Sequence, residues 1–121
     1  MTGSDMQTFR LNEISFVRRE NPVTGRMYET ARVLKDPETG MEAIYVRYPA
    51  GTITPRHSHP CAHGLLVIEG ELHTQAGLFG PGDMVWYPEG CEGEHGATAE
   101  QAVTVLLFTN KPFSVTYLDA M

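Results

Sequence analysis

The 121-residue sequence lacks several features that would place a protein outside the ordinary globular class. Its longest apolar runs, 65–68 and 103–108, are far shorter than the roughly 18–20 residues that span a bilayer. Its two cysteines, Cys61 and Cys91, are too few for a disulfide framework. No apolar signal segment follows the first methionine, so we expect a cytoplasmic protein with reduced thiols and no membrane partner.

The chain also has little positive charge. It carries 9 Lys and Arg against 15 Asp and Glu, for a formal net charge of −6. A nucleic-acid partner would require a basic patch, so we expect none. With 41% hydrophobic and 20% charged residues, the composition is typical of a folded globular chain rather than a disordered one.

Helical periodicity is absent as well, because no segment of a dozen residues repeats its apolar positions every 3.6 residues. What the chain has is many turns, with 12 glycines and 8 prolines. We expect a flexible tail over 1–10 and a single all-β domain, a barrel or a sandwich, over 11–121. The predicted strands are 11–18, 27–35, 41–48, 52–59, 64–68, 71–75, 84–87, 103–109 and 113–118.

Histidine is the residue type that stands out. His57 and His59 are two residues apart, so on a strand they project from one face, and His63 keeps the same parity. His95 follows a separate strand and reaches the same point only across a barrel. Neutral imidazoles facing one point suit a transition metal such as Zn, Fe, Cu, Ni or Co. For His73, alone on another strand, a surface position is the simpler interpretation.

The spacing of glycines around these histidines adds a family resemblance. One stretch reads Gly51-x5-His57-x-His59-x3-His63-x6-Gly70, and a second reads Gly82-x5-Pro88-x-Gly90-x4-His95. These stretches resemble the two motifs of the cupin superfamily, and the chain looks like a small single-domain cupin of the conserved-barrel type. The resemblance implies a double-stranded β-helix (a jelly-roll barrel), a homodimer, and one divalent metal ion, which could be Fe, Zn, Ni, Mn, Co or Cu. It also implies that His57, His59, His63 and His95 are the ligands of that metal.

Two departures from the family pattern matter for the chemistry. His63 stands where the family usually has a glutamate, so a divalent ion would give a site of charge +2 rather than +1. His95 lies two residues later than the usual spacing, where Gly93 has no side chain to offer. Cys91, Glu92 and Glu94 are the alternatives to His95.

The sequence leaves the function open. Tyr45, Tyr48, Trp86, Tyr87 and Arg47 lie on predicted strands, so about half of them should face a pocket or the core. The leading hypothesis is a metal-dependent dioxygenase acting on a small molecule, with no catalytic residue assigned. The alternatives are a non-catalytic cupin that senses a metal or ligand, and a redox-neutral isomerase or cyclase using Zn or Ni.

Overall fold

The computed structural model describes residues 5–118, and β-strands dominate this part of the chain. Its one helical element is a 3-10 turn, η1 (Leu11–Glu13), and no helix there is long and apolar enough to cross a membrane. The all-β prediction is confirmed. The strands are β1 (Val17–Glu20), β2 (Met27–Lys35), β3 (Glu42–Tyr48), β4 (Ile53–Ser58), β5 (His63–Glu69), β6 (Leu72–Thr74), β7 (Gly77–Phe79), β8 (Met84–Tyr87), β9 (Gly93–Ala97), β10 (Val103–Thr109) and β11 (Thr116–Tyr117).

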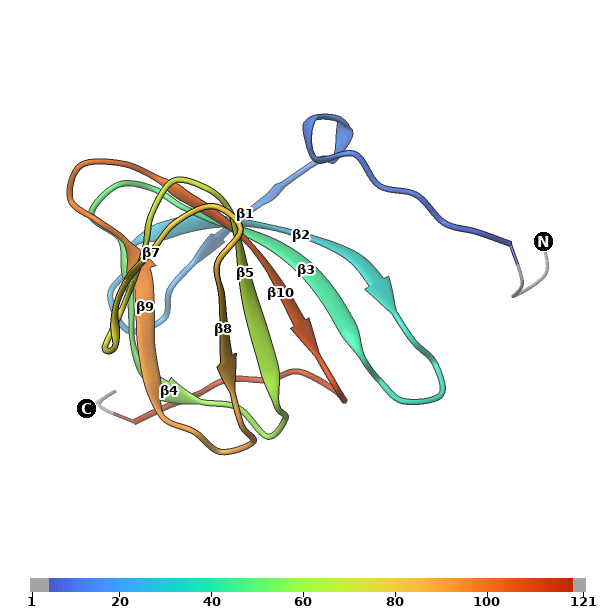
Figure 1. Cartoon of the computed structure of the whole chain (residues 1–121). Helices are drawn as coiled ribbons and strands as arrows, with labels where there is room; N and C mark the ends of the chain where they lie inside the picture. The colour runs from blue at the N-terminus through green and yellow to red at the C-terminus, as the bar shows by residue number, and fades with distance from the viewer. Residues whose placement is uncertain (1–4, 119–121) are drawn as a thin grey trace.

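The strands form two antiparallel sheets that curve around a common interior (Figure 1). The six-stranded sheet has the order β1-β2-β3-β10-β5-β8, and the five-stranded sheet has the order β11-β4-β9-β6-β7. From β3 onward the chain changes sheet at every connection between consecutive strands except that between β6 and β7. This two-sheet barrel is the double-stranded β-helix that the resemblance implied.

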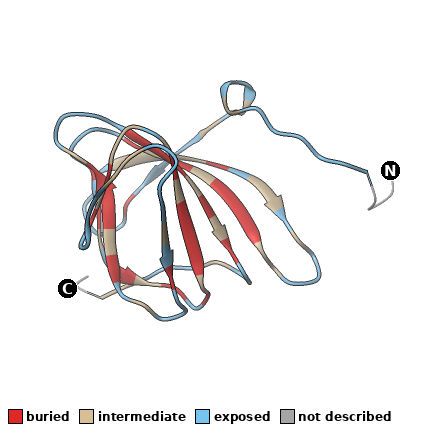
Figure 2. Cartoon of the chain, in the orientation of Figure 1, coloured by how far each residue is buried: buried red, intermediate tan, exposed pale blue. Residues whose placement is uncertain are grey.

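Alternation along the central strands builds the core between the sheets. On β3, Ile44, Val46 and Tyr48 are buried, whereas Tyr45 and Arg47 are half-exposed on the outer face. β5 and β10 alternate in the same way, and Figure 2 shows the buried residues concentrated on these strands. Burying one such aliphatic side chain contributes about 1.5–3 kcal/mol relative to leaving it exposed. The core consists of Ile44, Val46, Tyr48, Leu65, Val67, Leu72, Tyr87, Ala97, Val103, Val105 and Leu107.

Two predicted strands have wrong boundaries, and two strands were not predicted. Segment 11–18 alternates apolar and polar residues, yet only Val17–Glu20 pairs with another strand, β2, and Leu11–Glu13 form η1. The last strand is shorter than predicted, because only Thr116–Tyr117 pairs with β4. Strands β7 and β9 were not predicted, since their sequences are rich in glycine and poor in β-branched residues. They form because neighbouring strands supply their hydrogen-bond partners.

Candidate functional site

Four of the five histidines lie together inside the barrel. His57 is on β4, His59 directly follows that strand, His63 begins β5, and His95 is on β9. The ring centroids are 4.8 Å apart for His57 and His59, 4.9 Å for His57 and His95, and 4.4 Å for His59 and His63. All four residues are between 2% and 4% exposed. The structure thus brings together every histidine that the spacing singled out.

The other candidate ligands lie elsewhere. His73 sits on β6 between the inward-facing Leu72 and Thr74, so it points away from the interior. Glu94 precedes His95 on β9 and therefore projects from the opposite face. Cys91 packs at the edge of the hydrophobic core, and its Sγ lies 3.7 Å from the backbone oxygen of Glu92.

The pairing of β4 with β9 explains the longer spacing before His95. Gly93 pairs with His57, and His95 pairs with Thr54, so both β9 residues present the same face. A Cβ at Gly93 would lie 2.8 Å from Cε1 of Tyr87, because that ring already fills the space. A side chain is therefore excluded at 93, and the next inward position on the strand is 95.

Backbone carbonyls orient two of the rings. His57 Nδ1 lies 2.7 Å from the carbonyl oxygen of Pro55, and His59 Nδ1 lies 2.5 Å from that of Ser114. A carbonyl can only accept, so each Nδ1 carries the proton and each Nε2 keeps its lone pair. Metal-binding histidines commonly have their second nitrogen fixed in this way. The third ring, that of His95, has its Nδ1 3.4 Å from the hydroxyl of Tyr48.

Burial keeps the four imidazoles neutral. It lowers the pKa of His59 to about 4 and that of His63 to about 3, and neighbouring histidines add to both shifts. Burial also lowers the pKa of His57 and takes that of His95 well below its usual value. Near neutral pH all four rings are therefore available as lone-pair donors.

The donor chemistry of the cluster fits a transition-metal ion. Three buried ring nitrogens, His59 Nε2, His63 Nδ1 and His95 Nε2, have no hydrogen-bond partner. Unpartnered buried nitrogens are costly unless something else occupies the lone pair. As the side chains stand, no group of three or more His, Cys, Asp or Glu within residues 5–118 is arranged to hold a metal. Binding an ion would require the rings to turn within the cluster.

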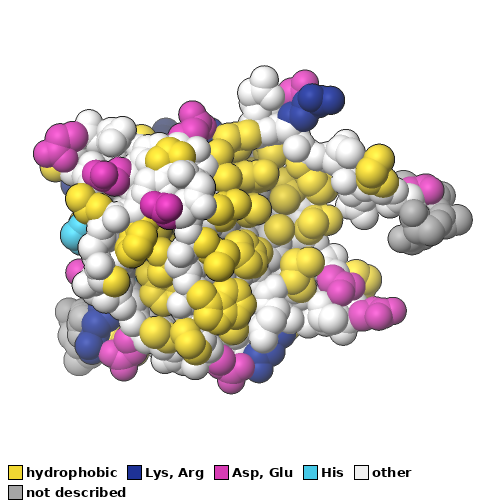
Figure 3. Space-filling view, viewed as in Figure 1, with side chains coloured by type: hydrophobic (Ala, Val, Ile, Leu, Met, Phe, Trp, Pro, Cys, Tyr) yellow, Lys and Arg dark blue, Asp and Glu magenta, His cyan; other side chains and the backbone are white. Residues whose placement is uncertain are grey.

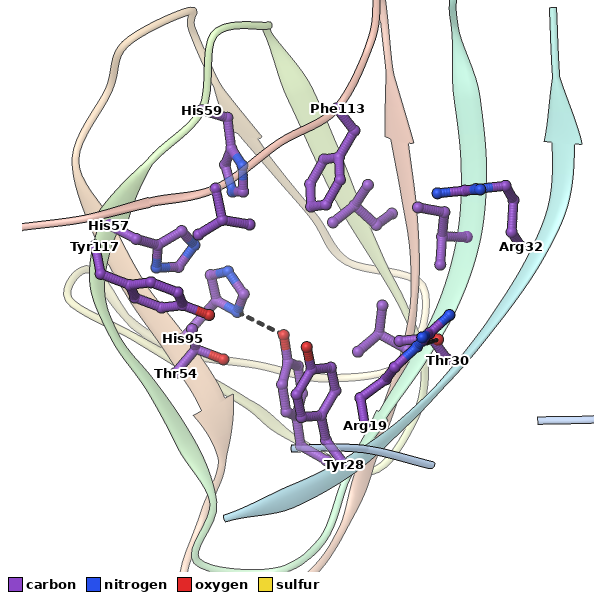
Figure 4. Close-up of a pocket in the computed structure, with 15 residues that line it drawn as sticks. Arg19, Tyr28, Thr30, Arg32, Thr54, His57, His59, His95, Phe113 and Tyr117 are labelled. Carbon is purple, nitrogen blue, oxygen red and sulfur yellow. Dashed lines mark hydrogen bonds between the residues drawn. The ribbon is translucent and has the colours of Figure 1, made fainter. Parts of the chain in front are cut away.

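A cavity of about 370 Å³ opens beside the cluster (Figure 4). His57, His59 and His95 line it, whereas His63 lies behind them with its ring stacked on Tyr87 at a centroid distance of 4.8 Å. The volume lies in the range of small-molecule pockets. The remaining lining residues are Arg19, Tyr28, Thr30, Arg32, Ile44, Val46, Tyr48, Thr54, Leu107, Phe113, Val115 and Tyr117.

Of the predicted pocket residues, only Tyr48 lines this cavity. Tyr87 is buried against His63, while Tyr45, Trp86 and Arg47 lie on the outer face. The contribution of β1 and β2 to the cavity was not predicted from the sequence. Alternation of Tyr28, Thr30 and Arg32 along β2 was the signal that could have revealed it, because these residues share one face. Nothing in the sequence shows that this face meets the histidines.

Comparison with known families gives one match in sequence. The family model described as the ChrR cupin-like domain matches residues 21–113, which covers most of the chain. No curated protein matches the chain.

Solved structures share the fold at low sequence identity. A crystal structure described as a possible acetylacetone dioxygenase from Methylibium petroleiphilum is 10% identical, with a TM-score of 0.78 and coverage of 100% of this chain and 88% of that chain. The polyketide cyclase RemF from Streptomyces resistomycificus is 17% identical, with a TM-score of 0.73 and coverage of 94% and 86%. A complex of Rhodobacter sphaeroides SigE with the anti-sigma ChrR matches at 22% identity and a TM-score of 0.67. There the match covers 83% of this chain and 51% of the other, about half its length.

Proposed function

Because the chain belongs to the ChrR cupin-like family, we propose that it is a metal-binding cupin that takes a small molecule into the cavity beside its histidines. His57, His59, His63 and His95 would hold one divalent ion. The observation that carries the proposal is the set of unpartnered buried nitrogens next to a cavity. Buried donors without partners are expected where a cation completes their coordination.

Backbone carbonyls and the cavity wall would support such a metal centre in different ways. Pro55 and Ser114 hold His57 and His59 in the tautomer that leaves Nε2 free. A bound divalent ion would supply Lewis acidity, and iron would add redox chemistry. Since no ligand is a carboxylate, the centre would carry a charge of +2 and attract substrate oxygen or sulfur atoms. The aromatic and aliphatic side chains of the cavity wall would exclude water around the body of the bound molecule.

Within this frame, the reaction that we favour is oxygenation of a small molecule that chelates through enolate, diol or thiol atoms. Three of the four imidazoles line the cavity, so a substrate bound there would lie next to the proposed centre. The shared fold of the possible acetylacetone dioxygenase is consistent with this chemistry. No side chain outside the centre is assigned a catalytic role.

A non-catalytic sensing domain is the second candidate. It is favoured by the family match itself and by the fold shared with the SigE–ChrR complex, in which ChrR is described as an anti-sigma. The chain would then bind a metal or ligand in order to regulate a protein partner. A redox-neutral Zn or Ni enzyme is the third candidate, and the fold shared with a polyketide cyclase is compatible with it.

Metal content and oxygen consumption test these candidates together. Protein purified without chelator is analysed for metals, and oxygen uptake is then followed after adding enolisable diketones, catechols or thiols. Bound iron with substrate-dependent uptake supports the dioxygenase. Tightly bound zinc without uptake contradicts it and favours the other two. Protein that takes up no metal at all contradicts the metal centre itself.

We also propose that the chain forms a homodimer through the outer face of the six-stranded sheet. Figure 3 shows hydrophobic side chains gathered over this sheet. Trp86 is 49% exposed and Met84 is 54% exposed, which is unusual for large apolar residues. The outward-facing apolar residues of β3, β5, β8 and β10 are Tyr45, Leu66, Ile68, Met84, Trp86, Leu106 and Phe108.

The apolar chemistry of this face fits a second copy of the chain as its occupant. Two chains of net charge −6 repel each other overall, and a contact through these apolar side chains adds no carboxylate to its core. Arg47 is the charged outward residue of β3, and its guanidinium lies 4.1 Å above the ring of Phe16. The four strands span about 20 Å by 20 Å. This is about half of the roughly 800 Å² that each partner contributes to a stable interface, so surrounding residues must supply the rest.

Composition and cysteine state bear on partners and location. We propose a cytoplasmic protein without a nucleic-acid partner. The net charge of −6 disfavours nucleic acid, and both cysteines are free, as expected in a reducing compartment.

A further inference from the structure

Two arginines face the histidines from the other wall of the cavity. Arg19 on β1 and Arg32 on β2 line the same space as His57, His59 and His95 (Figure 4). The arginines come from the six-stranded sheet, and His57 and His95 come from the five-stranded sheet. A molecule in the cavity therefore meets imidazoles at one end and guanidinium groups at the other.

The cavity wall is positive in an acidic chain. The protein has 15 acidic residues, yet none of the residues that line the cavity is Asp or Glu. Glu42 forms an ion pair with one of these arginines, because its Oε1 lies 2.7 Å from Nε of Arg32. Its Oε2 accepts the backbone N–H of Phe113 at 3.0 Å, and its side chain is 3% exposed. Glu42 thus neutralises the charge of Arg32, whereas the charge of Arg19 has no such partner in the described part of the chain.

Arg19 is the arginine that remains. Its Nε donates to the hydroxyl of Thr30 at 3.2 Å, and no carboxylate in residues 5–118 pairs with it. A neutral hydroxyl leaves the guanidinium charge uncompensated, and the N–H groups along the edge of the planar guanidinium can donate two parallel hydrogen bonds to a carboxylate. Between the two ends, the wall is aromatic and aliphatic, with Tyr28, Phe113 and Leu107 among its members.

We propose that the cavity binds a small organic acid with an apolar or aromatic body, and that Arg19 receives its carboxylate. The inference rests on the proposed role of this cavity as a small-molecule site, and it adds the chemical class of the ligand. The apolar middle of the cavity excludes water from the body of the ligand. A phosphate dianion fits less well, because it requires more donors than one uncompensated guanidinium provides.

The neighbouring arginine offers a matched control. Arg18 precedes Arg19 on β1 and projects from the opposite side of the strand, outside the cavity lining. Arg18→Gln and Arg19→Gln therefore remove the same charge from adjacent exposed positions. If the net charge of the protein determines ligand affinity, both variants should lose affinity. If the cavity determines it, only Arg19→Gln should lose affinity. Arg19→Lys keeps the charge but loses the two parallel hydrogen bonds.

The test compares phenylacetate with phenylacetamide, which has the same shape and no charge. Calorimetric titrations are run on chelator-treated protein, so the result does not depend on whether the metal centre exists. The wild-type chain should bind phenylacetate about tenfold more tightly than the amide. Arg19→Gln should abolish this preference, Arg19→Lys should keep part of it, and Arg18→Gln should leave it unchanged.

Several outcomes would overturn the proposal. Equal affinity for the two probes, no binding of either, or the same loss in Arg18→Gln as in Arg19→Gln would each do so. Inorganic phosphate that displaces phenylacetate at equal concentration would show a general anion site instead of a carboxylate site. If the protein takes up no metal but still binds phenylacetate through Arg19, the metal centre is contradicted and the carboxylate site is supported.

Discussion

His59 donates its Nδ1–H to the backbone carbonyl of Ser114, 55 residues further along the chain, at 2.5 Å. The same C-terminal segment stacks the ring of Phe113 on the imidazole, with a centroid distance of 4.7 Å and an angle of 30° between the planes. His59 lies beyond the end of β4, so its own strand does not fix the ring. Residues close to the C-terminus therefore set the tautomer and direction of a candidate ligand.

Removing one imidazole should remove most metal binding. His59→Ala and His57→Ala each delete a donor whose other nitrogen is fixed by a carbonyl, and we expect zinc or iron affinity to fall about 100-fold. His73→Ala, which deletes a histidine outside the cluster, is the matched control. Metal uptake is measured by competition with a chromogenic chelator. Equal affinity in His57→Ala and His73→Ala would contradict the proposed centre.

His63→Glu should keep metal binding and lower the charge of the centre from +2 to +1. The substitution restores the ligand type that the cupin motif usually carries at this position. The same chelator competition measures affinity, and metal-edge X-ray absorption reports whether an oxygen ligand has replaced a nitrogen. A metal environment identical to that of the unaltered protein would mean that His63 lies outside the coordination shell.

Acid should destabilise the metal-free protein. The folded state keeps His59 and His63 neutral down to pH of about 4 and about 3, whereas in the unfolded chain both protonate near pH 6.5. The unfolded state therefore binds more protons between these values, and the free energy of unfolding falls as the pH drops from 7 towards 4. Urea denaturation in the presence of chelator at pH 7, 6 and 5 measures the slope.

Two variants separate this effect from general acid sensitivity. His63→Gln removes one buried imidazole and should make the slope between pH 7 and 5 shallower, whereas His73→Gln should leave it as it is. A free energy of unfolding that is the same at pH 7 and pH 5 in the unaltered chain would show that the rings protonate while buried.

The turn at Gly70 should tolerate no side chain. Gly70 has φ of 82°, and a Cβ there would collide with the carbonyl oxygen of Ala102 and lie 3.0 Å from Cα of Val103. Both neighbours are backbone atoms, so they cannot move without distorting the chain around Ala102 and Val103. Gly25 has a similar φ of 74° with open space around it, so Gly25→Ala isolates the conformational cost of about 1–2 kcal/mol. Gly70→Ala should lower the free energy of unfolding by more, and equal losses would contradict the collision.

A charge at Trp86 should separate the proposed dimer. Trp86→Glu places a carboxylate on the edge strand β8 of the apolar outer face, within the proposed symmetric contact. Sedimentation velocity should show a dimer for the unaltered chain and a monomer for this variant. Leu78→Glu, at a 54% exposed position of the other sheet, should remain dimeric. A monomeric unaltered chain would refute the interface.

The sequence by itself determined the fold class and the members of the histidine cluster. Turn residues at regular intervals and the absence of a helical period led to an all-β chain, and the resemblance of the Gly–His spacing to the cupin motifs pointed to His57, His59, His63 and His95. These features are local, because turn geometry and strand parity depend on neighbouring residues. The same reasoning placed a strand over 11–18, where the structure pairs only Val17–Glu20.

Tertiary structure decided the rest. Strand β9 carries few β-forming residues, and it exists because β4 and β6 pair with it on either side. That pairing brings His95 beside His57. It also puts Gly93 next to the ring of Tyr87, which occupies the space that a side chain at position 93 would need. The placement of Arg19 and Arg32 opposite the histidines likewise depends on how two sheets face each other. Hydrogen bonding and packing between distant segments set these relationships, and no local pattern in the sequence records them.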